Sequence, residues 1–489
     1  MNWENNGEQI KNAQGSVIRN SSAYFKPVAI WSRINSGLFS IRYSEVKAVH
    51  NDACCFIANP DSLLLKYCTG FLNSSVRVKF LEELSPTLNY LPNTVNEIPF
   101  KIGKKEKVLF LVDSCINISR EDWDARETSW DFQTNELLCH RTGESTPDNL
   151  LANAVTAYET YWQEKFSQLH QNEEELNRIF IDLYGLQDEL TPDVAPDDIT
   201  ILGQEAKPHP RPLSLKQGEG VVDLQFDRRE IMAQFVSYAV GCMFGRYSLS
   251  KPGLVLASQG QTLADYQSEI EANGILADEN AFQPDADNII PILDEDWFAD
   301  DIVSRFRAFL RASFGDAEAS DRSFNQNLMF VEECLGMDLR KYFVRYFYDD
   351  HIRRYRRRPI YWLFRSPKGS FSALIYLHRY TPDTVARLLN GYLREYQDKL
   401  RNRREQQQTL SQSALATAGE KTRAQKEIDR LDKVLGELAQ YEREVIYPLA
   451  TNPIAMDLDD GVLVNYNRFG SALAPVKGLT EKAGSGEEE

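Results

Sequence analysis

Apolar residues recur at three- or four-residue steps along much of this 489-residue chain, and this spacing constrains its fold more than any other feature. In the segment 150–185, one face of a helix would carry Tyr158, Trp162, Phe166 and Leu169. The same periodicity predicts helices in the ranges 62–84, 228–247, 302–314, 326–356 and 384–446. We therefore expect a mainly helical protein.

The last of these ranges, 384–446, is interrupted near Ser411–Gly419. Its second arm carries an apolar stripe among charged residues, formed by Ile428, Leu431, Leu435, Leu438 and Tyr441. Such a stripe needs a partner to bury it. The first arm of an antiparallel helical hairpin is the simplest partner, and a homodimeric coiled coil is the alternative.

Strands are predicted in two regions. Residues 1–112 hold short apolar stretches separated by polar turns, and Lys107–Val112 is a further strand candidate. A β-hairpin is predicted from Ile360–Phe364 and Phe371–His378, joined by the turn Ser366-Pro367-Lys368-Gly369. The predicted fold class is α+β, mainly helical: a mixed N-terminal part, then a helical region with an inserted β-hairpin and a C-terminal helical hairpin.

Shifts in composition divide the chain into five predicted parts. Prolines crowd the range 191–222, which is typical of an irregular loop. The parts are 1–112, a mixed segment; 113–225, a connector and helical segment with the Pro-rich loop; 226–380, a helical region with a basic helix end and the β-hairpin; 381–478, the helical hairpin and C-terminal segment; and 479–489, a disordered tail.

The N-terminus is polar, and no run of 18 or more apolar residues occurs, so neither a secretion signal nor a membrane span is expected. Seven cysteines are scattered without a framework spacing, which is typical of free thiols in a reducing compartment. These features predict a cytoplasmic protein that makes no contact with a membrane. The Cys and His spacing also gives no zinc set, so no metal site is expected.

The charge is distributed unevenly. The chain has a net charge of −17, yet residues 340–404 contain 17 Lys or Arg and 5 Asp or Glu. Residues 261–301 contain twelve acids and no Lys or Arg. Such segregation indicates separate surfaces for separate partners.

The sequence contains no complete catalytic motif. A glycine-rich loop after a strand and an Asn/Asp-Pro-Pro-Tyr/Phe element, both needed by an adenine methyltransferase, are absent, as are a phosphate loop and a GxSxG elbow. No catalytic residue is therefore assigned. One alternative stays open, because Asp197, Glu205 and Lys207 have the composition of a Mg²⁺-dependent nuclease site.

Basic residues give the strongest candidate site. Arginines provide bidentate contacts to phosphate and to guanine edges, which predicts a DNA-binding surface where they cluster. At a helix end and the β-hairpin the candidates are Arg353, Arg354, Arg356, Arg357, Arg358, Arg365, Lys368 and Arg379. In the first segment they are Lys26, Arg33, Arg42, Arg77 and Lys79. An acidic partner surface, such as 261–301, and simple solvation are the alternatives for the helix-end group.

Several stretches, taken together in order, resemble the C-terminal half of the PglX family of BREX phage-defence adenine methyltransferases, and more loosely type IIG restriction-modification enzymes. Leu72-Asn73-Ser74-Ser75 departs from the family's usual LNSK. The stretches that carry the resemblance are Tyr24–Tyr43, Gly70–Lys79, Leu84–Pro99, Ser119–Phe132, Asn172–Val194, Ser237–Leu249, Asp287–Asp296, Arg357–Tyr380 and Met456–Tyr466.

The resemblance implies that residues 1–112 are part of a target-recognition domain. It also implies a separate catalytic domain that binds S-adenosylmethionine and methylates adenine N6 at a non-palindromic site. This chain lacks that domain, so it is expected to be a fragment, a split subunit or a truncation that binds no cofactor itself.

The leading hypothesis is a DNA-recognition and scaffolding portion of such an enzyme, with double-stranded DNA, the catalytic methyltransferase domain or subunit, and other phage-defence proteins as partners. The alternatives are an interaction subunit of a defence complex without DNA affinity, and the nuclease.

Overall fold

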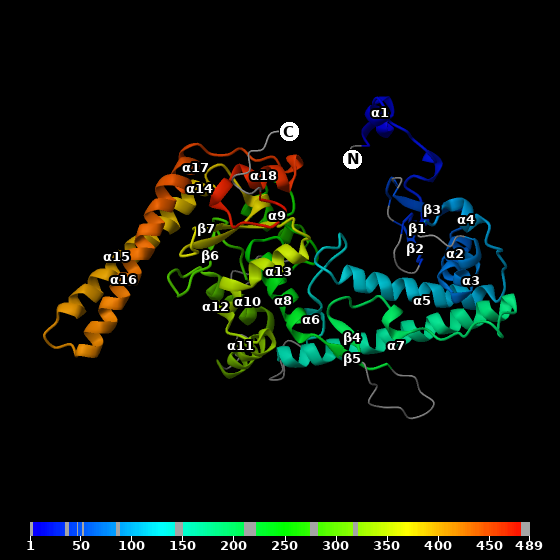
Figure 1. The fold of residues 1–489 in the computed structure, drawn as a ribbon, viewed down its shortest axis with the longest axis horizontal. Helices are drawn as coiled ribbons and strands as arrows, with labels where there is room; N and C mark the ends of the chain where they lie inside the picture. Colours follow the sequence, from blue (N-terminus) through cyan, green and yellow to red (C-terminus); the bar gives the residue numbers. More distant parts are fainter. Residues whose placement is uncertain are drawn as a thin grey trace. The chain divides into compact units, whose positions relative to one another are not determined.

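The chain forms two compact units in a computed structural model that describes residues 3–34, 39–45, 47–50, 53–84, 89–141, 150–209, 222–273, 282–315 and 321–480. Each unit is assembled from two separate segments of the chain. The first comprises Met1–Trp123 and Tyr161–Gln225, and the second Asp124–Thr160 and Phe226–Glu489 (Figure 1). The long helix predicted at 150–185 is present as α7 (Leu151–Tyr184), which contributes residues to both units.

The first unit contains a three-stranded antiparallel sheet of order β2-β1-β3. The central strand β1 (Val28–Ser32) pairs with β2 (Arg42–Ser44) on one side and β3 (Cys54–Ala58) on the other. A second, two-stranded sheet joins β4 (Ala206–Pro208) to β5 (Leu224–Phe226).

Helices bury the apolar face of the first sheet, and aromatic rings fill the space between them. Tyr67 and Phe71 of α2 (Ser62–Asn73) both pack edge-on or tilted against Phe180 of α7. Gly70 allows a close approach, since a Cβ there would lie 2.4 Å from the Val112 side chain. The helices of this unit besides α7 are α1 (Glu4–Asn12), α2 (Ser62–Asn73), α3 (Ser75–Leu84), α4 (Pro92–Asn96) and α5 (Lys105–Asp124).

Two predictions for this unit were wrong in detail. The predicted strand Lys107–Val112 lies inside α5, because its buried residues recur at helical and not alternating steps. The predicted helix 62–84 is two helices separated at Ser74, whose backbone is extended. A residue far along the chain stabilises this break, since the Ser75 N–H donates to Asn177 Oδ1 at 2.8 Å.

The second unit is built around a three-stranded sheet of order β6-β8-β7, and the predicted β-hairpin is confirmed. Tyr361–Arg365 forms β7, Ser372–Tyr376 forms β8, and β6 (Ile290–Pro291) pairs with β8. The following helices pack in this unit: α8 (Arg228–Met243), α10 (Ile302–Phe314), α11 (Asp321–Leu335), α12 (Leu339–Arg345) and α13 (Phe347–Arg354). The last three replace the single helix predicted at 326–356.

The predicted helical hairpin is also confirmed, and four of the five residues of its apolar stripe are buried within the same chain, while Leu435 is half-buried. Helix α15 (Arg394–Gln412) runs alongside α16 (Ala418–Tyr441), as Figure 1 shows. Thr417 and Glu420 cap the start of α16 reciprocally. The remaining helices of the second unit are α6 (Glu136–Cys139), α9 (Leu263–Ala272), α14 (Thr384–Arg387), α17 (Tyr447–Thr451) and α18 (Val462–Arg468).

The mainly helical α+β class predicted from the sequence is therefore confirmed. Within the described ranges, no helix combines the length and the hydropathy that crossing a bilayer requires. The predicted tail, from residue 481 onward, lies outside the described residues.

The packing of α8 gives a test of the second unit's core. A Cβ added at Gly241 would lie 2.4 Å from the ring of Tyr247, which is buried and stacked on Tyr238. We expect Gly241→Ala to lower the free energy of unfolding by about 1–3 kcal/mol, because the ring must move. Gly436→Ala in α16 is the control, since an added Cβ there meets nothing within 4 Å. This substitution should raise the free energy of unfolding by about 0.5–1 kcal/mol. Urea unfolding of both variants measures the difference, and equal midpoints would contradict this account of the packing.

Candidate functional site

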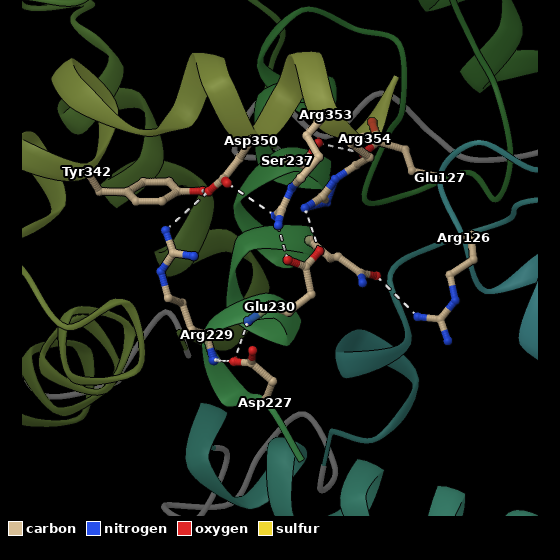
Figure 2. Close-up of polar contacts among 11 residues, drawn as sticks. Arg126, Glu127, Asp227, Arg229, Glu230, Ser237, Tyr342, Asp350, Arg353 and Arg354 are labelled. Atoms are coloured by element: carbon tan, nitrogen blue, oxygen red, sulfur yellow. Dashed lines mark hydrogen bonds and ion pairs between the residues drawn. The ribbon is translucent and has the colours of Figure 1, made fainter. Parts of the chain in front are cut away.

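The basic helix end predicted to bind DNA is the C-terminus of α13, and its first two arginines are paired with carboxylates of the protein, although the Arg353 side chain is 47% exposed. Glu230, near the start of α8, accepts hydrogen bonds from Arg353 at 2.7 Å and from Arg354 at 3.2 Å (Figure 2). The side chains of Glu230 and Arg354 are each only 11% exposed. Because a buried charge is costly without a partner, this carboxylate and these guanidinium groups hold each other in place.

A second carboxylate on α13 itself, that of Asp350, completes the network. It accepts from Arg353 at 3.2 Å and from the Tyr342 hydroxyl at 2.9 Å, and it lies 3.7 Å from Arg229 (Figure 2). The start of α8 is fixed by Asp227, whose side chain accepts the N–H groups of Arg229 and Glu230. Arg353 and Arg354 therefore have intramolecular partners for their charge.

The next three arginines, Arg356, Arg357 and Arg358, are exposed. In the described part of the chain, no carboxylate lies within ion-pair distance of them. They form the turn that joins α13 to β7, which we call the arginine turn. Arg357 lies beside the backbone at Gly478, where an added Cβ would be 3.3 Å from its Nη1.

The backbone of the arginine turn is unusual. Arg356 has φ 50° and Arg357 has φ 62°, both in the left-handed region. Their N–H groups donate back to the carbonyls of Arg353 and Ile352, which is the hydrogen-bond pattern of a helix end that glycine normally occupies. A left-handed residue with a Cβ costs about 1–2 kcal/mol, so two arginines here store strain.

The arginine turn is fastened at both ends by buried side chains. At its far end, Nε2 of His351 accepts the N–H groups of Ile360 at 3.2 Å and Tyr361 at 3.1 Å. At its near end, the Tyr355 hydroxyl donates to Glu127 Oε1 at 2.9 Å. Because two donors occupy Nε2, the imidazole is neutral and carries its proton on Nδ1.

Burial lowers the pKa of His351 well below its ordinary value, and the nearby positive charges of Arg354 and Arg246 lower it further. A second histidine of this unit, His378, has its pKa lowered to about 4, mainly by burial and also by Arg246.

The other three predicted residues of the second unit lie apart from the arginine turn. Arg365 and Lys368 are exposed at the tip of the β-hairpin, roughly 20 Å from Arg358 if the intervening strand is extended. This tip is attached to α16, because the Lys368 N–H donates to Glu437 at 2.7 Å. Arg379 is buried and donates to three main-chain carbonyls, so its charge does not lie on the surface.

The predicted basic residues of the first unit come from separate elements. Lys26 and Arg42 are exposed, and Arg42 donates to Thr200 Oγ1 at 3.3 Å. Arg33 is half-buried at the end of β1. Lys79 pairs with a carboxylate, Glu189, at 3.1 Å.

Arg77 differs from these four because it is buried. It lies over the ring of Phe39, and burial lowers its pKa to about 10. A phosphate could not reach this guanidinium without displacing its packing.

The three residues of the nuclease alternative do not share an environment. Asp197 and Lys207 are exposed, whereas Glu205 is buried. Among the described residues, no three His, Cys, Asp or Glu side chains lie close enough together to hold a metal ion. The geometry thus gives the nuclease no support.

Sequence reasoning missed Glu230, Glu127 and the role of His351. Glu230 carried a usable signal, since it precedes an almost wholly apolar run in α8 and a buried acid requires a cation. Its partners lie more than 120 residues away, so the sequence did not identify them.

Comparison with known proteins gives two relatives. Adenine-specific methyltransferase PglX of Lacticaseibacillus casei (strain Zhang) is 35% identical over 498 residues, which cover 98% of this chain and 38% of that protein. The chain is homologous to part of the PglX-type adenine-specific methyltransferases. Adenine-specific methyltransferase BrxX of Escherichia coli O9:H4 (strain HS) is 30% identical over 509 residues, 99% of this chain and 39% of that protein. The resemblance to PglX seen in the sequence is confirmed, and the chain spans about two fifths of the length of either relative. No family model matches the chain.

The buried state of His351 gives a pH prediction. In the unfolded chain the imidazole gains a proton as the pH falls below about 6.5, whereas the folded His351 resists protonation, so acid favours unfolding. Through this residue the free energy of unfolding should therefore fall as the pH is lowered through 6.5.

His351→Gln retains an acceptor near Nε2 and cannot titrate. We expect the difference in unfolding free energy between wild type and this variant to shift in favour of the variant as the pH falls from 7 to 5. The contribution of His378 has the same sign but is present in both proteins, so it cancels. Urea titrations at the two pH values measure this shift, and a difference that does not change with pH would contradict the assignment.

Proposed function

We propose that this chain is a DNA-recognition and scaffolding portion of a BREX-type N6-adenine DNA methyltransferase that acts in phage defence in the cytoplasm. Its relationship to PglX and BrxX over nearly its whole length supports the enzyme class. The sequence lacks the S-adenosylmethionine loop and the Asn/Asp-Pro-Pro-Tyr/Phe element. A catalytic domain or subunit would therefore supply the cofactor site and the chemistry, with other phage-defence proteins as further partners.

One observation carries the DNA-recognition part of the proposal: Arg356, Arg357 and Arg358 are exposed and free of carboxylates among the described residues. In a chain of net charge −17, three adjacent cations without an internal partner form a local site for a polyanion. Phosphate contacts from such arginines would position the duplex, and base contacts elsewhere would specify the sequence.

Replacing Arg356, Arg357 and Arg358 together with Ala should weaken binding to duplex DNA. Each phosphate contact contributes about 0.9 to the slope of log K against log salt concentration, so the slope should become shallower by about 2–3. Fluorescence anisotropy with a labelled duplex, measured over a series of salt concentrations, tests this.

The control replaces three exposed arginines of the helical hairpin, Arg401, Arg423 and Arg443, with Ala. This variant changes the net charge equally and should keep the wild-type slope. If both variants bind equally well, the arginine turn is not the DNA site. If the wild-type chain has no affinity for DNA, the recognition role itself fails.

A second candidate is an interaction subunit without DNA affinity. The tip of the helical hairpin favours it, because Leu415 is 96% exposed between α15 and α16. Absence of DNA binding, together with capture of the methyltransferase catalytic domain that is lost in Leu415→Asp, would support this candidate over the first.

A further inference from the structure

The arginine turn combines backbone strain with side chains that face solvent. Arg356 and Arg357 both adopt the left-handed conformation, and the N–H groups of Arg356, Arg357 and Arg358 are all bonded within the turn or to α13. Glycine would give the same backbone without a steric penalty. The arginine side chains are therefore not needed to close this turn, and their exposed positions are available to a partner.

Buried side chains at both ends hold the arginine turn in place. His351 lies under it, fully packed between Tyr355 at 4.7 Å and Tyr361 at 4.8 Å between ring centroids. Its Nε2 accepts the N–H groups of Ile360 and Tyr361, while Tyr355 is bonded to Glu127. Removing these contacts would free the turn without altering its charge.

The acids nearest the turn do not neutralise it. Glu230 binds Arg353 and Arg354, and Asp350 binds Arg353 and Tyr342. Asp349 of α13 is exposed and makes no ion pair with the turn among the described residues.

We propose that the arginine turn is a preformed contact for the phosphodiester backbone of duplex DNA, and that His351 is its positioning residue. The inference rests on the proposed function and adds two points to it: the geometry of the turn that contacts the phosphates is set before DNA arrives, and His351 sets it. Preorganisation raises affinity because the ordering cost of the turn is already met in the free protein.

Glycine substitutions separate the side chains from the fold. Arg356→Gly and Arg357→Gly should each raise the melting temperature by about 1 °C, because the relief of a strained Cβ exceeds the entropy that glycine adds to the unfolded chain. The same variants should bind DNA about five- to tenfold more weakly at 0.1 M salt, with a slope shallower by about 0.9 each. Arg443→Gly in the helical hairpin is the matched control, and it should show the opposite pattern of lower stability and unchanged binding.

Two duplexes of unrelated sequence distinguish phosphates from bases. Equal losses on both support phosphate contact, whereas a loss confined to one sequence overturns it. If the wild type binds DNA and the glycine variants bind equally well, the inference fails while the proposed function stands. If the wild type does not bind, the proposed function fails first.

The positioning role is tested by variants that keep all three charges. His351→Leu removes the acceptor for two N–H groups, and Tyr355→Phe removes the hydrogen bond that holds the other end of the turn. Both should lower the affinity several-fold with the salt slope unchanged, because the same phosphates are contacted by a less ordered turn. His351→Gln should restore the affinity. Wild-type affinity in Tyr355→Phe together with no rescue by Gln would overturn the role of the clamp.

Discussion

The arrangement of the basic region depends on the two ion pairs that the Glu230 carboxylate makes with Arg353 and Arg354. This carboxylate lies in the buried part of α8 and accepts hydrogen bonds from two consecutive arginines of α13. Breaking a buried pair of this kind costs about 3–5 kcal/mol, because the surviving charge is left without a partner. The C-terminus of α13 is therefore fixed on α8, and the arginine turn follows directly after its C-cap residue, Tyr355.

This pairing also decides which cations remain available. Five arginines crowd the end of α13 and the following turn, but among the described residues only Glu230 and Asp350 form ion pairs with them. Both carboxylates are taken by Arg353 and Arg354, which leaves three positive charges in solvent. The negative end of the helix dipole offsets part of their mutual repulsion, so the cluster is tolerated without further acids. An interior ion pair thus determines the electrostatics of the surface beside it.

Elements whose stabilising contacts are local can be predicted from the sequence. Features that depend on contacts between residues far apart in the chain cannot. Helix α7 and the hairpin of β7 and β8 follow from periodicity and turn chemistry within single segments. The break between α2 and α3 could not be predicted, because Asn177, about a hundred residues away, fixes it. The arginines looked equivalent for the same reason, since the distant Glu230 takes two of them and Arg379 is buried against main-chain carbonyls. The left-handed turn had no signal either, because no glycine marks it.

The strained backbone of the arginine turn is kept in its conformation by the buried side chains around it. A strained backbone relaxes unless neighbouring contacts hold it, and here His351 and the Tyr355–Glu127 bond provide those contacts. A neutral histidine suits this position because each of its two Nε2 contacts requires an unprotonated acceptor. Burial, together with the positive charges of Arg354 and Arg246, keeps the pKa of His351 low. These contacts therefore hold the arginine turn in one conformation. A partner that matches the spacing of its three cations binds without the cost of ordering a loop.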